Sequence, residues 1–141
     1  MIDINQYRPK QSGKLKKIKS SENGCTHIGN NPDGNECRQY QTDGGVYEKN
    51  TAEGRCDYLV LNDTAKRAYF IELKGSNIGH AIEQLEKSVK DIQASLRGYQ
   101  IFRRIIYKTG SHDVHSSAVL QWKKKCQGTA LVKQKQYEEI I

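Results

Sequence analysis

The chain has 141 residues, a formal net charge of +7, 35% hydrophobic residues and a mean hydropathy of −0.82. This length predicts a single domain over residues 1–141 with a modest core, and the excess of lysine and arginine favours a polyanionic partner. No apolar run approaches the roughly 20 residues of a bilayer span, and residues 1–20 lack the pattern of a signal peptide, so we expect a cytoplasmic protein without membrane contact.

The first 21 residues are strongly basic. They hold one acid, Asp3, and six cations: Arg8, Lys10, Lys14, Lys16, Lys17 and Lys19. We expect residues 1–21 to form a basic arm or a short helix that contacts phosphates, with Lys14, Lys16 and Lys17 as candidate nucleic-acid contacts. A solvated tail without fixed structure is the alternative.

Residues 22–45 are rich in glycine and asparagine, which predicts loops. Within them, the alternation of residues 36–42 predicts a first strand, and Asp43-Gly44-Gly45 predicts a turn after it.

The four cysteines are too few and too scattered for a secreted disulfide framework. Cys25, His27 and Cys37 could bind zinc together with Cys56 or Cys126, although no C-x-x-C pair is present. A zinc-stabilised interaction module is therefore one alternative.

Two apolar runs, Cys56–Leu61 and Ala68–Leu73, flank a polar and turn-prone segment. Their aromatic and branched residues predict a β-hairpin. The tightest pairing across the turn joins Leu61 to Ala68.

In this register Asp57 lies directly opposite Glu72, and Lys74 follows on the same face. Opposed like charges are destabilising, and one lysine neutralises only one of them. Mg²⁺, with Mn²⁺ as an alternative, prefers such carboxylate oxygens and polarises phosphates. The residues therefore predict phosphodiester hydrolysis, with Asp57 and Glu72 as metal ligands and Lys74 as the stabiliser of developing charge.

The remaining elements follow in order. An apolar stripe predicts a helix over residues 78–97, capped by Asn77. Residues 99–108 have strand composition and should lie beside the second strand of the hairpin. A second helix is predicted over residues 113–126, and a last edge strand over residues 129–134. The second helix carries three candidate nucleic-acid contacts: Lys123, Lys124 and Lys125.

Asp57, followed after fourteen residues by Glu72-Leu73-Lys74, resembles the active-site hairpin of the PD-(D/E)xK nuclease superfamily, which includes restriction endonucleases and Holliday-junction resolvases. The similarity covers residues 47–108, and Cys56 stands where the family name has proline. The resemblance implies a restriction endonuclease-like α/β core, with a mixed sheet of four to five strands flanked by helices. A non-catalytic nucleic-acid-binding protein that retains this fold is the alternative.

The resemblance also implies a further acid upstream of Asp57. Glu48 is the first candidate, and Asp43, Glu36 and Glu53 remain open. Gln84 on the long helix could position a phosphate or a water molecule. The expected partner is nucleic acid, with DNA favoured over RNA, in restriction, anti-phage defence or DNA processing. A homodimer is an open alternative, since small nucleases of this type often need two copies to cut two strands.

Overall fold

The computed structural model describes residues 1–47, 55–74, 76–109 and 114–141. The elements of this part of the chain are η1 (Ile4–Gln6), β1 (Gln11–Gly13), β2 (Lys17–Glu22), β3 (Cys25–Asn30), β4 (Cys37–Gln41), η2 (Thr42–Val46), β5 (Tyr58–Asn62), β6 (Arg67–Lys74), α1 (Ile78–Ile92), η3 (Gln93–Ser95), β7 (Gln100–Tyr107), α2 (Ser117–Lys125), β8 (Ala130–Gln134) and β9 (Gln136–Ile140).

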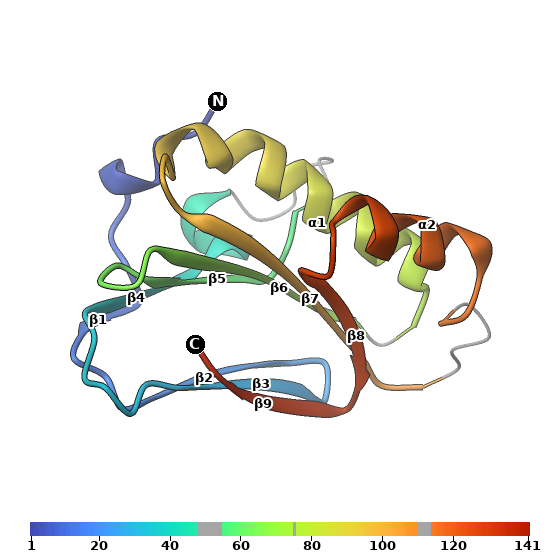
Figure 1. Ribbon diagram of the computed structural model, residues 1–141, viewed down its shortest axis with the longest axis horizontal. Coiled ribbons are helices and arrows are strands. Elements are labelled where there is room, and N and C mark those ends of the chain that lie inside the picture. Colours follow the sequence, from blue (N-terminus) through green and yellow to red (C-terminus); the bar gives the residue numbers. More distant parts are fainter. Residues whose placement is uncertain (48–54, 75, 110–113) are drawn as a thin grey trace.

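These elements form three layers: a layer of helices, a six-stranded sheet and a three-stranded sheet (Figure 1). The larger sheet has the strand order β1-β4-β5-β6-β7-β8, and the smaller one has the order β2-β3-β9. Both parallel and antiparallel pairs occur in each sheet. The protein is therefore a mixed α/β protein, as the sequence predicts.

The central hairpin forms in the predicted register. Leu61 pairs with Ala68 across β5 and β6, and the N–H of Asp57 donates to the carbonyl of Ile71 at 3.0 Å. The chain then runs through α1 to β7, which lies parallel to β6 as predicted. A helix is the usual connection between two parallel neighbours, because the chain must return to the starting edge of the sheet.

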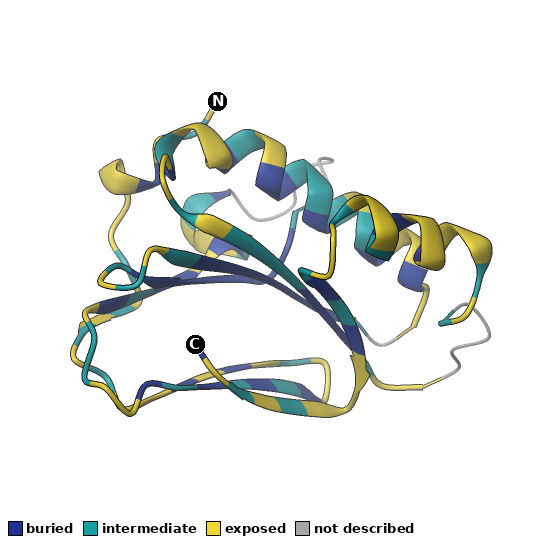
Figure 2. Ribbon diagram, viewed as in Figure 1, coloured by how far each residue is buried: buried dark blue, intermediate teal, exposed yellow. Residues whose placement is uncertain are grey.

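Helix α1 begins as predicted, with Asn77 Oδ1 accepting a hydrogen bond from the N–H of His80 at 3.1 Å. It ends at Ile92, earlier than the predicted residue 97, and the chain continues through η3 to Gly98 at φ +84°. Figure 2 shows buried residues along its inner side, toward the sheet. The buried residues of α1 are Ile78, Ala81, Leu85, Ser88, Val89 and Ile92.

Ser88 links this helix to the hairpin. Its buried hydroxyl oxygen accepts a hydrogen bond from the N–H of Cys56 at 2.8 Å, just before the hairpin begins. We expect Ser88→Ala to leave that buried N–H unsatisfied and to lower the free energy of unfolding by about 1–3 kcal/mol. Urea denaturation would measure this, with the exposed Glu83→Ala on the same helix as the control. An equal effect of both variants would contradict the prediction.

The sheet is larger than the predicted four to five strands, and both helices cover the same face of it (Figure 1). The other face is covered by the three-stranded sheet, which packs its own apolar cluster against it. The predicted flanking helices therefore cover one face only, and a second sheet that the sequence does not predict covers the other.

Two of the sequence predictions fail between residues 11 and 30, in β1 of the larger sheet and in β2 and β3 of the smaller one. Residues 11–13 and 17–22, predicted as an arm or a short helix, are strands, and so are residues 25–30, predicted as loop. In β2 the lysines alternate with the buried Ile18 and Ser20, so the charged side chains point to solvent while the strand packs on its other side. The sequence does not predict this strand, because its many lysines make the segment look like a charged arm rather than an alternation of buried and exposed residues.

The two arginines of β7 point to opposite faces, as their adjacent positions require. Arg103 forms an ion pair with Glu86 of α1, whereas Arg104 forms one with Glu139 of β9 at 2.7 Å. Each arginine therefore links the six-stranded sheet to one of its two covering layers.

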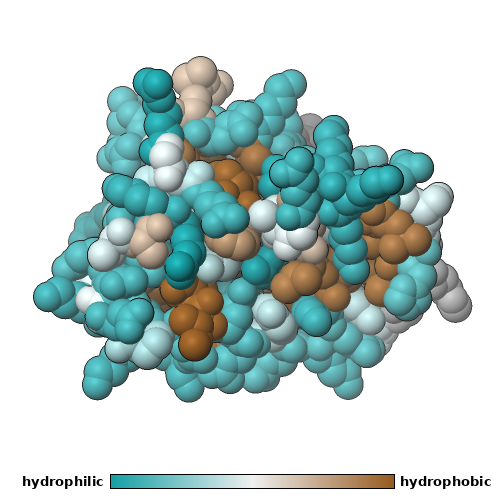
Figure 3. Space-filling view, in the orientation of Figure 1, coloured by the Kyte–Doolittle hydropathy of each residue, from teal (hydrophilic) through white to brown (hydrophobic). Residues whose placement is uncertain are grey.

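Helix α2 and strand β8 agree with the sequence predictions where they are described, whereas β9 follows β8, which the sequence predicts as the last strand. Helix α2 is capped by Ser116 and buries Val119 and Trp122, while the predicted start at Asp113 lies outside the described residues. Strand β8 forms an edge of the larger sheet, as predicted. No helix in the described part of the chain combines the length and apolar character that a bilayer span requires. Hydrophilic residues cover most of the visible surface, with separate hydrophobic patches between them (Figure 3).

Candidate active site

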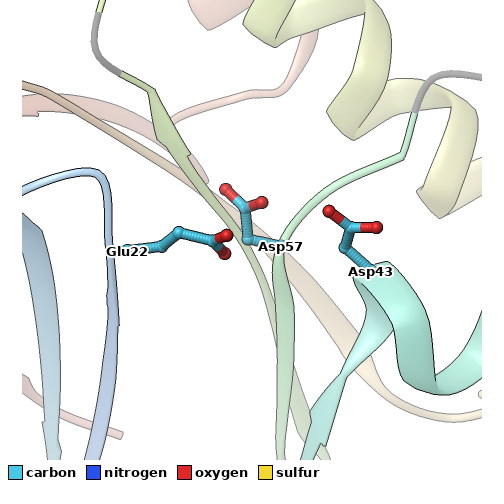
Figure 4. Close-up of side chains that lie close together, drawn as sticks. All are labelled: Glu22, Asp43 and Asp57. Carbon is cyan, nitrogen blue, oxygen red and sulfur yellow. The ribbon is translucent and has the colours of Figure 1, made fainter. Parts of the chain in front are cut away.

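Three carboxylates converge beside the start of β5. Glu22 at the end of β2, Asp43 in η2 and Asp57 each offer one oxygen, and these oxygens lie within 4.8 Å of one another. Figure 4 shows the three side chains arriving from three separate segments. Glu72 adds a fourth carboxylate, since its charge and that of Asp57 act directly on each other.

Asp43 is placed by its neighbour Thr42, which is fully buried. The N–H of Thr42 donates to the carbonyl of Asp57 at 3.0 Å, and its hydroxyl donates to the carbonyl of Cys56. The chain turns away at Gly44, whose φ of +89° lies in the left-handed region that favours glycine. Arg55 donates from Nε to Asp43 Oδ1 at 2.9 Å and so partly offsets its charge.

Glu22 is placed by the two-residue turn between β2 and β3. Asn23 and Gly24 both have positive φ, +55° and +75°, which matches the right-handed twist of a hairpin. Asn23 Nδ2 also donates to the carbonyl of Leu73 at 2.9 Å. This bond fixes the turn to the end of β6 and brings Glu22 to the other carboxylates.

Asp57 and Glu72 are both buried, at 8% and 2% exposure. Asp57 Oδ2 accepts a hydrogen bond from the N–H of Leu73 at 2.7 Å. Burial raises the pKa of the Asp57 carboxyl, and it raises the pKa of Glu72 further, with the charge of Asp57 acting in the same direction. Without a cation at the site, a proton is therefore held on this pair, chiefly on Glu72.

One oxygen of Glu72 has no hydrogen-bond donor. Oε2 is buried, and no donor reaches it among the described residues. A buried polar atom without a donor is costly, and either the proton that this pair shares or a bound cation would satisfy it. A hard divalent cation that prefers carboxylate oxygens fits this donor set.

Lys74 lies on the same face as Glu72, and Nζ donates to Gln84 Oε1 at 2.7 Å. The first turns of α1 therefore hold the ammonium group beside the carboxylates, and the charge of Lys74 acts on both Asp57 and Glu72. Gln84 had been expected to position a phosphate or a water molecule. In this structure its side-chain oxygen is bonded to the lysine.

Gln84→Ala would release the Lys74 ammonium from this position. We expect kcat to fall about 10-fold or more with little change in KM, because the lysine would act on the transition state and its misplacement is costly. Steady-state cleavage assays would measure both constants, with Glu83→Ala on the adjacent exposed position as the control. A loss confined to KM would instead assign Gln84 to substrate binding.

The upstream acids divide into three groups. Asp43 is part of the carboxylate cluster, whereas Glu36 lies at the far end of β5, where its carbonyl accepts from the N–H of Asp63 at 2.8 Å. Glu48, the first candidate, and Glu53 lie outside the described residues. Sequence reasoning did not select Glu22, although the Asn-Gly dipeptide after it is a strong hairpin signal.

The predicted basic contacts lie away from the cluster. Lys14, Lys16 and Lys17 are exposed at the start of β2, the end of that strand opposite to Glu22. Lys123, Lys124 and Lys125 end α2. Lys125 lines a pocket of about 510 Å³ with Gln100 and Ile101 at the beginning of β7. Lys74 pairs with Tyr107 at the other end of that strand, so the pocket and the carboxylate cluster lie toward opposite ends of β7.

The cysteines do not form the zinc site considered as an alternative. Cys25, Cys37 and Cys56 are buried free thiols, and His27 Nε2 lies 2.7 Å from Glu139 Oε2. Within the described ranges, the one group of three or more metal-binding side chains within reach of a common ion consists of carboxylates.

No protein-family model, no curated protein and no solved structure matches this chain. A functional inference therefore depends on the chemistry of the site itself.

Proposed function

We propose that this protein is a Mg²⁺- or Mn²⁺-dependent nuclease of the PD-(D/E)xK type. The observation that carries the proposal is the buried pair Asp57 and Glu72, with an oxygen of Glu72 lacking a donor among the described residues and two further acids beside it. Lys74 is held next to this pair by Gln84. The set combines a cation site and a fixed positive charge, which phosphodiester hydrolysis uses together.

The order of elements around the site supports the same family. β5, β6, α1 and β7 follow one another as strand, strand, helix and strand, with the E-x-K residues at the end of β6. Cys56 replaces the proline of the family pattern. Its N–H is bonded to Ser88, and proline could not donate there, so the hydrogen bond gives a physical reason for the departure.

Glu22, Asp43 and Asp57, whose oxygens lie within 4.8 Å of one another, would hold the cation, and Glu72 lies beside Asp57 as the further acid that the sequence predicts. When bound, a divalent cation supplies Lewis-acid polarisation of a phosphate oxygen and lowers the pKa of a water molecule. The chain itself would contribute the ammonium of Lys74, which stabilises the negative charge that develops on the phosphate. The backbone N–H of Leu73 keeps Asp57 oriented during this step.

The choice of DNA as the substrate rests on the charge of the chain and on the family resemblance. A net charge of +7 favours a polyanion, and the resembled nucleases act chiefly on DNA, so DNA is proposed ahead of RNA. Cutting of both strands by a homodimer is part of the same proposal, as is a role in restriction, anti-phage defence or DNA processing.

Purified protein incubated with supercoiled plasmid, single-stranded DNA and tRNA tests the proposal directly. We expect cleavage of at least one substrate in Mg²⁺ or Mn²⁺ and none in EDTA. The substrate that is cleaved identifies the polymer. Intact substrates in both metals, with salt-sensitive binding unaffected by EDTA, would instead support a non-catalytic nucleic-acid-binding protein.

A further inference from the structure

Two exposed lysines, Lys10 and Lys108, contact the segments that carry the carboxylate cluster. Arg55 is paired with Asp43, and Lys74 is bonded to Gln84. Lys10 and Lys108, in contrast, form no ion pair with any described residue, and both are exposed. Their charges are therefore available to an external anion.

Lys108 follows β7 and lies next to Lys74. Its N–H donates to the carbonyl of Lys74 at 3.1 Å. Its side chain crosses the β2–β3 turn, where a Cβ added to Gly24 would lie 3.3 Å from Cδ and Cε and 3.4 Å from Nζ. The absence of a side chain at Gly24 leaves room for this lysine directly over the turn that positions Glu22.

Lys10 approaches the cluster from the N-terminal segment. Its Nζ lies 5.4 Å from the ring centroid of Tyr58, the residue after Asp57, in a cation–π arrangement. The Tyr58 hydroxyl in turn donates to the carbonyl of Ser21, the residue before Glu22, at 3.4 Å. The ammonium group of Lys10 is thus held over the residues that adjoin two of the four acids.

We propose that Lys10 and Lys108 bind backbone phosphates of the nucleic acid next to the scissile one. A cluster of four carboxylates repels a polyanion, so substrate binding requires compensating positive charge at its border. These two lysines supply that charge, and neither forms an ion pair with a residue that the structure describes. This inference rests on the proposed nuclease function and assigns the substrate contacts to residues outside the predicted groups at 14–17 and 123–125.

Binding of a fluorescein-labelled oligonucleotide, single-stranded and duplex, would test this by fluorescence anisotropy in EDTA over a series of salt concentrations. We expect Lys10→Ala and Lys108→Ala each to raise Kd several-fold and to reduce the slope of log K against log salt by about 0.7–0.9, the value for one phosphate contact. In Mg²⁺ or Mn²⁺, KM should rise while kcat stays nearly constant. Lys90→Ala, at an exposed lysine of α1 outside every predicted contact, is the matched control and should leave both Kd and the slope unchanged.

Slopes for Lys10→Ala and Lys108→Ala that equal the wild-type slope would overturn the inference, as would wild-type protein that binds neither oligonucleotide. Cleavage by the wild type is scored separately, so the two proposals can fail independently. A cleaving enzyme with unchanged slopes retains the nuclease function and loses these contacts. A protein that does not cleave but shows the reduced slopes retains the contacts and loses the enzymatic function.

Discussion

Asp57→Asn should reduce metal-dependent cleavage by about 10³-fold or more, and Lys74→Ala by about 10²–10³-fold. Asparagine keeps the size of Asp57 and an oxygen for the N–H of Leu73, but it lacks the negative charge that holds a cation. Removal of Lys74 leaves the cation site and removes the fixed charge beside the phosphate. Plasmid cleavage rates in Mg²⁺ and Mn²⁺ would measure both losses.

The folded structure should survive these substitutions. Burial raises the pKa of Asp57, so the charged carboxylate is disfavoured in the metal-free protein and a neutral amide relieves that cost. A normal unfolding midpoint for Asp57→Asn would therefore separate lost chemistry from lost structure. Glu36→Gln is the matched control, because this exposed acid lies at the opposite end of β5 and should retain wild-type activity.

Asp43→Asn and Glu22→Gln distinguish the members of the cluster. Both acids are partly exposed, and Asp43 is already paired with Arg55, so we expect weaker metal dependence and smaller losses than for Asp57→Asn. Cleavage that persists at the wild-type rate in both Asp57→Asn and Lys74→Ala would place the chemistry elsewhere in the molecule.

The metal-free protein should lose stability as the pH rises from about 5 to about 9, by up to about 1.4 kcal/mol per pH unit. Burial and the charge of Asp57 raise the folded-state pKa of Glu72 above its unfolded value. In the interval between the two values the folded protein binds more protons than the unfolded chain. The stability contributed by this group is therefore complete below the unfolded pKa and is lost as the pH passes through the folded one.

Asp57, whose pKa is also raised, contributes to the same loss, whereas three other shifted carboxyls act at lower pH. Asp63, Asp91 and Glu139 have lowered pKa values, since hydrogen bonds and cations outweigh their burial. Their contributions to stability are lost at acidic pH, below the window in which Glu72 acts. Urea denaturation in EDTA at a series of pH values would record the slope, and Glu72→Gln should flatten it.

Divalent cations should restore the stability that the metal-free protein loses as the pH rises. Binding to the deprotonated pair would add about 2.7 kcal/mol at a metal concentration 100 times Kd, and the increment should grow with pH because binding displaces the shared proton. Glu72→Gln should show little of this increment. A wild-type protein whose stability is independent of both pH and metal would contradict the assignment of Glu72 as a buried, protonated ligand.

Local sequence patterns were sufficient to predict the register of the central hairpin and the start and buried side of α1. The pairing of Leu61 with Ala68 follows from two apolar runs around a polar turn, because this pairing closes the tightest hairpin between them. Asn77 and the apolar stripe likewise specify the start and the buried side of the helix. Asp57, Glu72 and Lys74 thus come together through contacts that are near in sequence.

Tertiary structure alone decided which other acids join them. Glu22 reaches the cluster because the β2–β3 turn is bonded to Leu73, and β3 pairs in parallel with β9 at the other end of the chain. Pairings between such distant segments leave no local period in the sequence, and lysines obscure the alternation of β2. The amino-acid sequence by itself determined a hairpin with two acids and one lysine. Only the tertiary structure decided that the pairing of β4 with β5 adds Asp43 and that the packing of the second sheet adds Glu22.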